Sequence, residues 1–158
     1  VVYAVTRERF HGTKPALPLR VADAGDLDEL VAASAAMARE EAHDDPQSRN
    51  PGLFRERIRA RVARGRDFVH VIDGALAFKG NIAALSEVGG QLEGIYTLPS
   101  MRRRGLGRRG TATLTSWVLE RTTRASLLVN DDNDAARALY ASLGYEPVYA
   151  SRTIFVAP

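Results

Sequence analysis

Apolar residues recur at two spacings along the chain, and the changes between them predict where helices and strands lie. Leu27, Leu30 and Val31 share one face of a helix, which we expect to begin after the N-cap Asp26 and to run to about Ala42. The same three-to-four-residue spacing predicts three further helices, over residues 54–64, 106–121 and 133–143.

Short apolar runs and alternating patterns between these helices predict strands. The pair Asp73-Gly74 fits a two-residue hairpin turn, and Gly89-Gly90 marks a second hairpin. We therefore expect two consecutive hairpins in the middle of the chain. The expected strands cover residues 1–5, 19–21, 68–72, 75–85, 91–97, 125–129 and 145–156.

Length and composition fit one globular domain with a core of its own. The chain has 158 residues, of which 45% are hydrophobic and 26% are charged. It has no cysteine, which excludes disulfides, cysteine metal ligands and thiol catalysis and suits the cytoplasm, where we place the protein. Its three histidines are far apart and lack ligand spacing, so we expect no metal. No apolar run approaches the roughly 20 residues of a membrane span, so we expect no membrane partner.

The most informative stretch combines arginines and glycines just before the helix predicted at 106–121. Gly105, Gly107 and Gly110 leave the backbone bare, so that N–H groups there and at the helix start could enclose an anion. This pattern predicts a cradle for a ligand with several phosphates, and a solvated basic turn is the alternative. The net charge is only +3, yet five basic residues gather here: Arg102, Arg103, Arg104, Arg108 and Arg109.

Two motifs in this part of the chain resemble those of a known family. The segment RRRGLG, Arg102 to Gly107, is similar to the pyrophosphate-binding motif of the GCN5-related N-acetyltransferases (GNAT), which transfer an acetyl group from acetyl-CoA to an amine. Asn130, Asn133, Tyr140 and Gly144-Tyr145 are similar to a second signature of that family. The resemblance implies an α/β (α+β) fold, with a mixed, mostly antiparallel sheet of six or seven strands flanked by about four helices.

The resemblance covers residues 19–156 and divides the chain into an N-terminal extension or lead-in strand, 1–18, and an acetyltransferase domain, 19–158. The family closes its sheet with a hairpin, but only 14 residues follow Gly144. Either the last strand is short or missing, or residues 1–5 fill its place.

A narrower resemblance concerns the phrases FKGN, LEGIYTLP and VNDDN. They are similar to those of an actinobacterial group in which such a domain ends a longer, two-part chain. A first residue Val1 in place of methionine fits a fragment of such a protein. A homodimer or an association with an upstream domain stays open.

The resemblance also implies roles for individual residues. Tyr140 stands where the family has its general acid, and the alternative is that Tyr140 only packs the last helix. Three acids, Glu40, Glu41 and Glu93, are candidates for the general base and stay unranked. The residues expected to bind the cofactor, acetyl-CoA, are Ile95, Tyr96, Thr97, Arg102, Arg103, Arg104, Gly105, Leu106, Gly107, Arg108, Asn130 and Asn133.

The implied function is transfer of the acetyl group of acetyl-CoA to a primary amine of a small molecule or peptide by direct attack. Glu40, Glu41, Asp44 and Asp45 gather near the end of the first long helix, where they would attract a cationic amine whose identity the sequence does not give.

Three other functions compete with acetyl transfer. A non-catalytic, acetyl-CoA-binding regulatory module is the first. A nucleic-acid partner is less favoured, because the net charge is small although the arginines cluster. The residues Gly105 to Gly110 also read GxGxxG, which is the pattern of a dinucleotide-binding βαβ unit, but they lie late in the chain.

Overall fold

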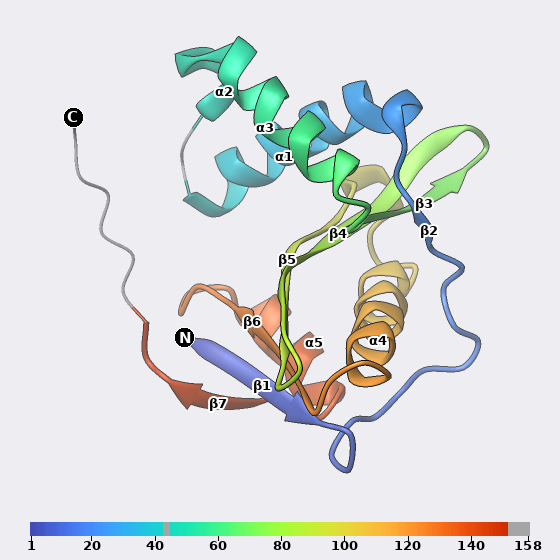
Figure 1. The fold of residues 1–158 in the computed structure, drawn as a ribbon, viewed down its shortest axis with the longest axis vertical. Helices are drawn as coiled ribbons and strands as arrows, with labels where there is room; N and C mark the ends of the chain where they lie inside the picture. Colours follow the sequence, from blue (N-terminus) through green and yellow to red (C-terminus); the bar gives the residue numbers. More distant parts are fainter. Residues whose placement is uncertain (43–44, 152–158) are drawn as a thin grey trace.

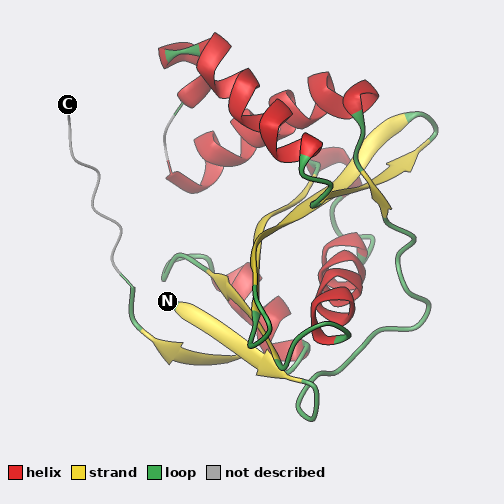
Figure 2. Ribbon diagram, in the orientation of Figure 1, coloured by secondary structure: helices red, strands yellow, loops and turns green. Residues whose placement is uncertain are grey.

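The residues that the structure describes form a seven-stranded sheet with helices on both faces (Figures 1 and 2). The computed structural model describes residues 1–42 and 45–151. The strands are β1 (Val2–Thr6), β2 (Arg20–Val21), β3 (Asp67–Ile72), β4 (Ala75–Leu85), β5 (Gly90–Thr97), β6 (Arg124–Leu128) and β7 (Glu146–Tyr149). The α-helices of the described residues are α1 (Leu27–Ala42), α2 (Pro46–Arg49), α3 (Pro51–Ala63), α4 (Leu106–Leu119) and α5 (Asp134–Ser142).

The strand order is β2-β3-β4-β5-β6-β1-β7, and every pairing in the described chain except β5–β6 is antiparallel. The fold class expected from the sequence is therefore confirmed. The dinucleotide-binding alternative is wrong, because that fold requires an open, mostly parallel sheet.

Local signals in the sequence explain several element boundaries. Asp73 and Gly74 have φ angles of 51° and 78°, as the predicted two-residue hairpin turn between β3 and β4 requires. The side chain of Asn133 accepts a hydrogen bond from the backbone N–H of Ala136 and caps α5, as expected. The N-cap before α1 is Asp23, three residues earlier than expected, because a turn of 3-10 helix, Ala24–Asp26, precedes the α-helix.

In the described part of the chain, two apolar clusters form the core, one on each face of the sheet. On one face Phe78 and Leu92 pack with Leu114 and Val118 of α4. On the other face, Leu30 of α1 belongs to a cluster with residues of α3, β3, β4 and β5. The sheet is thus a shared wall between α4 and the α1–α3 pair, as Figure 2 shows.

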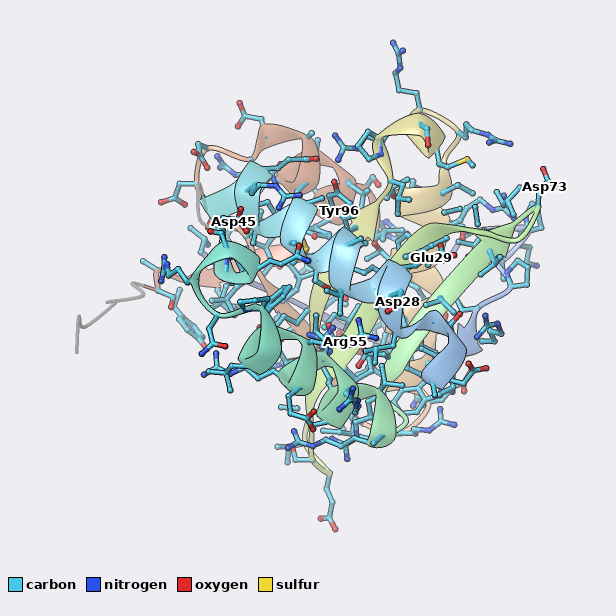
Figure 3. The ribbon with its side chains drawn as sticks, turned by 90° about the horizontal axis from the view of Figure 1, so that it is seen from above. Asp28, Glu29, Asp45, Arg55, Asp73 and Tyr96 are labelled. Atoms are coloured by element: carbon cyan, nitrogen blue, oxygen red, sulfur yellow. The ribbon has the colours of Figure 1, made fainter. Side chains whose placement is uncertain are left out.

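An ion pair joins α3 to α1: Arg55 Nη2 lies 2.6 Å from Asp28 Oδ1 (Figure 3). A second ion pair joins α3 to β3, so Arg61 is not simply part of the solvated arginine-rich face of this helix. Arg61 Nε donates to both oxygens of the buried Asp67 at 2.8 and 2.9 Å, and so ties α3 to β3.

The N-terminal strand lies inside the sheet, between β6 and β7 (Figure 1). Val2 to Thr6 pair with Leu128 to Arg124, and the amino group of Val1 donates to the carbonyl of Val129 at 2.9 Å. Of the two arrangements left open by the sequence, the structure shows the one in which the first residues fill a place in the sheet. The closing strand expected over 145–156 is described only to residue 151, and β7 ends at Tyr149.

The strands β5 and β6 run side by side for only part of their length. Their parallel pairing joins Gly90 to Leu92 with Ala125 to Leu127 and then stops. Beyond Leu92, none of the described strands lies beside the edge of β5 that faces β6. This divergence positions the site described next.

Candidate active site

A cavity of about 650 Å³ opens where β5 and β6 diverge, between the end of α1, the start of α4 and one face of α5. A second cavity of about 290 Å³ adjoins it on the side of α1 and β6. The residues singled out from the sequence that line the larger cavity are Glu40, Glu41, Ile95, Tyr96, Thr97, Arg102, Arg103, Gly105, Leu106, Gly107, Arg108, Asn130, Asn133 and Tyr140.

Two of the predicted site residues lie elsewhere. Glu93 lines the smaller cavity and not the larger one. Arg104 lines neither of these cavities and is exposed, with its guanidinium 3.0 Å from the sulfur of Met101.

The start of α4 has the properties of an anion cradle. Gly105 is its N-cap with φ 74° and ψ 4°, and among the described residues no side chain caps this end. The first backbone N–H groups of α4 can therefore bind a ligand. A Cβ at Gly107 would lie 3.3 Å from Thr97 Oγ1, at the cavity wall, so glycine keeps the backbone accessible there. These features fit a pyrophosphate.

The third glycine of the predicted cradle has another role. Gly110 lies in the second turn of α4, where a Cβ would come within 2.4 Å of the Phe78 ring. The absence of a side chain at Gly110 therefore lets α4 pack closely on β4.

The clustered arginines have different partners and different roles. Arg109 donates to the carbonyls of Pro15 and Ala16, at 3.0 and 3.2 Å, and so fastens the loop after β1 to α4. Arg108 donates to Ser142 of α5 and also lines the cavity. Arg103, with φ 60°, lines the cavity from the turn before α4.

The end of α1 is connected to the cradle by an ion pair. Arg102 Nη2 lies 2.7 Å from Glu40 Oε2, and the hydroxyl of Tyr96 donates to Glu40 Oε1 at 2.6 Å; Figure 3 shows Tyr96 alongside α1. Burial alone would raise the pKa of Glu40, but the hydrogen bonds from Tyr96 and Arg102 hold it below its ordinary value. Glu40 is thus an ionised partner of Arg102.

Glu41 has a different environment, because it lines both cavities. Although Glu41 is an exposed residue, desolvation of its carboxyl raises its pKa. The repulsion of Glu40 adds to this rise, and the attraction of the Lys79 ammonium group opposes it.

Two further acids, Asp44 and Asp45, were expected near Glu41. Asp45 caps α2, and its Oδ1 lies 3.6 Å from Arg39 Nη1. Asp44 lies outside the described residues. Of the described acids in the predicted four-acid cluster, Glu41 is therefore the one that lines both cavities.

Tyr140 lines both cavities from α5. It is 8% exposed, and its ring lies 6.0 Å from that of Tyr145. Burial, with a smaller effect of the Glu41 charge, raises the pKa of the Tyr140 hydroxyl above its ordinary value. The phenol is consequently protonated at neutral pH and can donate a proton or a hydrogen bond.

The two asparagines hold the ends of neighbouring elements at the cavity. Asn130 Nδ2 donates to the backbone carbonyl of Glu41 at 3.0 Å and so links the segment after β6 to α1. Asn133 caps α5 and lines both cavities.

A buried polar group under this site was not predicted from the sequence. Lys79 is 2% exposed in β4, and Asn81 is 1% exposed two residues further on. The signal was present in the sequence, because Lys79 is a charged residue inside the apolar run of a predicted central strand. The cavity walls also include Asp132 and Leu139, which no motif indicated.

Among residues 1–42 and 45–151, no group of three or more histidine, aspartate or glutamate side chains is arranged to hold a metal ion. Within the same residues, none of the helices has the length and apolar character needed to cross a membrane.

The second half of the sequence matches a family model: residues 80–155 match the model described as FR47-like protein. No curated protein matches the sequence significantly. Solved structures do match the fold. A GNAT-family acetyltransferase from Colwellia psychrerythraea has a TM-score of 0.72 at 17% identity, over 92% of this chain and 51% of that protein. The chain thus spans about half the length of the Colwellia protein.

Two further structures are matched almost from end to end. A possible acetyltransferase from Clostridium difficile 630 has a TM-score of 0.73 at 18% identity, over 89% of this chain and 98% of that one. A protein from Clostridium acetobutylicum, described as a predicted acetyltransferase with acetyl-CoA, has a TM-score of 0.70 at 16% identity, over 87% and 95%. At these identities the likeness concerns the fold. The chain therefore contains a domain with the fold of the GNAT acetyltransferases.

Proposed function

We propose that the protein is an acetyl-CoA-dependent N-acetyltransferase that acts on a primary amine of a small molecule or peptide. The observation that carries the proposal is that three features line the same, larger cavity: the α4 N-terminus without a side-chain cap, the unpaired edge of β5 and the protonated Tyr140. The Clostridium acetobutylicum structure with acetyl-CoA supports this choice of cosubstrate.

The start of α4 would hold the pyrophosphate of the cosubstrate. Its free N–H groups bind phosphate oxygens, the positive end of the helix dipole adds to the attraction, and Arg103 and Arg108 supply charge at the cavity wall. Asn133 also lines the cavity, from the start of α5, which its side chain caps. When bound, acetyl-CoA supplies a thioester carbonyl that an amine can attack.

The edge of β5 would stabilise the oxygen of that carbonyl as negative charge develops on it. The backbone N–H of Leu98 donates to Ala77 of β4 at 3.1 Å. Because backbone directions alternate along a strand, the N–H groups of Ile95 and Thr97 point the other way, toward the cavity. A backbone donor held in this position stabilises the transition state of acyl transfer.

Two side chains would then move protons. The amine nitrogen forms a bond to the acetyl carbon while the carbon–sulfur bond breaks. Tyr140 gives its proton to the departing thiolate, and the amine loses a proton to a base. Of the three candidates for that base, Glu41 is favoured by position and by its raised pKa, whereas Glu40 is occupied by Arg102.

An acetylation screen over primary amines and peptides, with release of free CoA as the readout, tests the proposal. We expect at least one amine to give steady CoA release and a product heavier by one acetyl group. Tight binding of acetyl-CoA with no transfer to any member of a broad library would instead support the regulatory module. Salt-dependent binding of DNA or RNA that CoA does not displace would support nucleic-acid binding.

A further inference from the structure

A buried lysine supports the backbone at the floor of the site. The side chain of Lys79 leaves β4 on the face covered by α1, where Met37 Sδ lies 3.9 Å from Nζ. Its ammonium group donates to the backbone carbonyl of Gly94 in β5 at 2.9 Å. The proposed mechanism gives this lysine no task, although burial of an ammonium group is costly and needs compensation.

Gly94 sits in a bulge of β5. The register of β4 and β5 shifts between the pairs Lys79–Tyr96 and Asn81–Glu93, so that more residues of β5 than of β4 lie between them. Gly94 has a φ of 60°, which favours glycine, and a Cβ there would lie 2.5 Å from Asn81 Oδ1. The bulge is therefore fitted closely to the two polar side chains of β4.

The bulge determines where one backbone donor of the site points. Gly94 and Ile95 share one peptide unit, in which the carbonyl of Gly94 and the N–H of Ile95 point in opposite directions because the bond is trans. Lys79 contacts the carbonyl end, and the N–H end faces the cavity that Ile95 lines.

We propose that Lys79 is a positioning residue for acetyl transfer, which fixes and polarises the Gly94–Ile95 peptide so that the Ile95 N–H binds the carbonyl oxygen of the acetyl group. The inference rests on the proposed function. A cation at one end of a peptide unit draws electron density toward its carbonyl oxygen and makes the N–H at the other end a stronger donor. Because the carbonyl is held before substrate arrives, the donor needs no reorganisation during the reaction.

The charged groups that act on Lys79 lie on α3, β3, α1 and β5. Arg61 of α3 disfavours the ammonium form, while Asp67 of β3, Glu41 of α1 and Glu93 of β5 favour it. Burial is the largest effect, and together these influences lower the pKa of Lys79 to about 8. The polarisation therefore weakens as the pH rises through this range, since the neutral amine is a poorer donor to the Gly94 carbonyl.

The first test uses Lys79→Met, which keeps the length of the side chain and removes the donor. We expect kcat to fall about 10-fold, which is less than the loss of a whole oxyanion donor, with unchanged acetyl-CoA affinity. The decline of kcat above about pH 8 should also disappear. Lys14→Met, which removes an exposed ammonium group far from the site in sequence, is the control and should match the parent.

The second test needs no variant and no activity. In the parent protein labelled with ¹³C and ¹⁵N, NMR between pH 6 and 10 follows the Lys79 Cε, the Gly94 carbonyl carbon and the Ile95 amide. All three signals should titrate with one midpoint near pH 8. Gly94 and Ile95 signals that stay fixed while Lys79 titrates would overturn the proposal, as would Lys79→Met with the parent's kcat and pH profile.

These outcomes separate the inference from the function on which it rests. If the parent transfers no acetyl group to any amine, the proposed function fails, whatever the NMR shows. If the parent is active and the Gly94 and Ile95 signals ignore the charge of Lys79, only the role of Lys79 fails.

Discussion

At the scale of single residues, Tyr140 is the proposed proton donor. Replacing it with phenylalanine removes one oxygen and preserves the ring that packs near Tyr145. We expect Tyr140→Phe to lower kcat by about 10- to 1,000-fold with little change in acetyl-CoA affinity, as for loss of a general acid. Tyr149→Phe, at an exposed position of β7, is the control. Equal turnover in both variants would return Tyr140 to a packing role.

Glu41 is the proposed base, and its raised pKa sets the direction of the pH dependence. A base works in its ionised form, so kcat/KM should rise as the pH increases through a pKa above the ordinary carboxyl value. Glu41→Gln should lower kcat/KM and remove this acid limb, whereas Glu93→Gln should retain it. If Glu93→Gln loses the limb and Glu41→Gln keeps it, the assignment of the two acids must be exchanged.

The role of a residue could be predicted from the sequence where that role depends on neighbouring residues in the chain. Asn133 as a cap and Asp73-Gly74 as a turn both act through their own backbone or the next few residues. Lys79 could not be assigned in this way. Its partner, Gly94, belongs to the next strand, and their contact depends on the register shift between β4 and β5.

At the scale of elements, the Arg61–Asp67 pair tests what holds α3 to the sheet. Asp67 is 2% exposed, and burial raises its pKa although Arg61 opposes the shift. Arg61→Ala leaves this carboxylate without its partner, which should cost about 3 kcal/mol of unfolding free energy. Arg59→Ala breaks an exposed pair with Glu56 on the same helix and should cost about 0.5 kcal/mol or less. Equal losses in urea denaturation would contradict a structural role for the buried pair.

The elements themselves were largely predictable, with errors at their ends. Apolar periodicity located α1, α4 and α5, because each packs one face on the sheet. The short helix α2 was missed, because Pro46 and Pro51 suggest a loop when each proline in fact begins a helix. The divergence of β5 from β6 leaves no signal in either strand alone, so the cavity itself was not predictable.

At the scale of the whole molecule, β1 and the segment after it pack against the C-terminal part of the domain. Gly144 follows α5 with φ 90°, and a Cβ there would lie 1.9 Å from the carbonyl oxygen of Arg9. Gly144→Ala should therefore cost more than the roughly 1–2 kcal/mol of a left-handed alanine, because the segment after β1 must move. Gly74→Ala, with φ 78° and open space around it, isolates the backbone cost. If thermal unfolding shows that both variants lose the same stability, the segment after β1 moves without strain and this prediction is wrong.

The place of β1 in the sheet shows why the strand order could not be predicted from local sequence patterns. An apolar run at residues 1–5 predicts a strand, but the run pairs with β6 and β7, more than 100 residues away. Nothing within the run distinguishes this place from an edge. The sequence therefore left two arrangements open, and the long-range pairing decided between them.

The central claim is that the start of α4 binds acetyl-CoA, and calorimetric titration of acetyl-CoA into the parent, Gly107→Val and Gly52→Val tests it most directly. Gly107 is partly buried and lines the cavity, whereas Gly52 is an exposed helical residue of α3. We predict that the parent and Gly52→Val bind alike, and that folded Gly107→Val binds at least about 10-fold more weakly, because its side chain fills the approach to the backbone. Parent-like affinity in folded Gly107→Val, or no binding by the parent, would contradict the account.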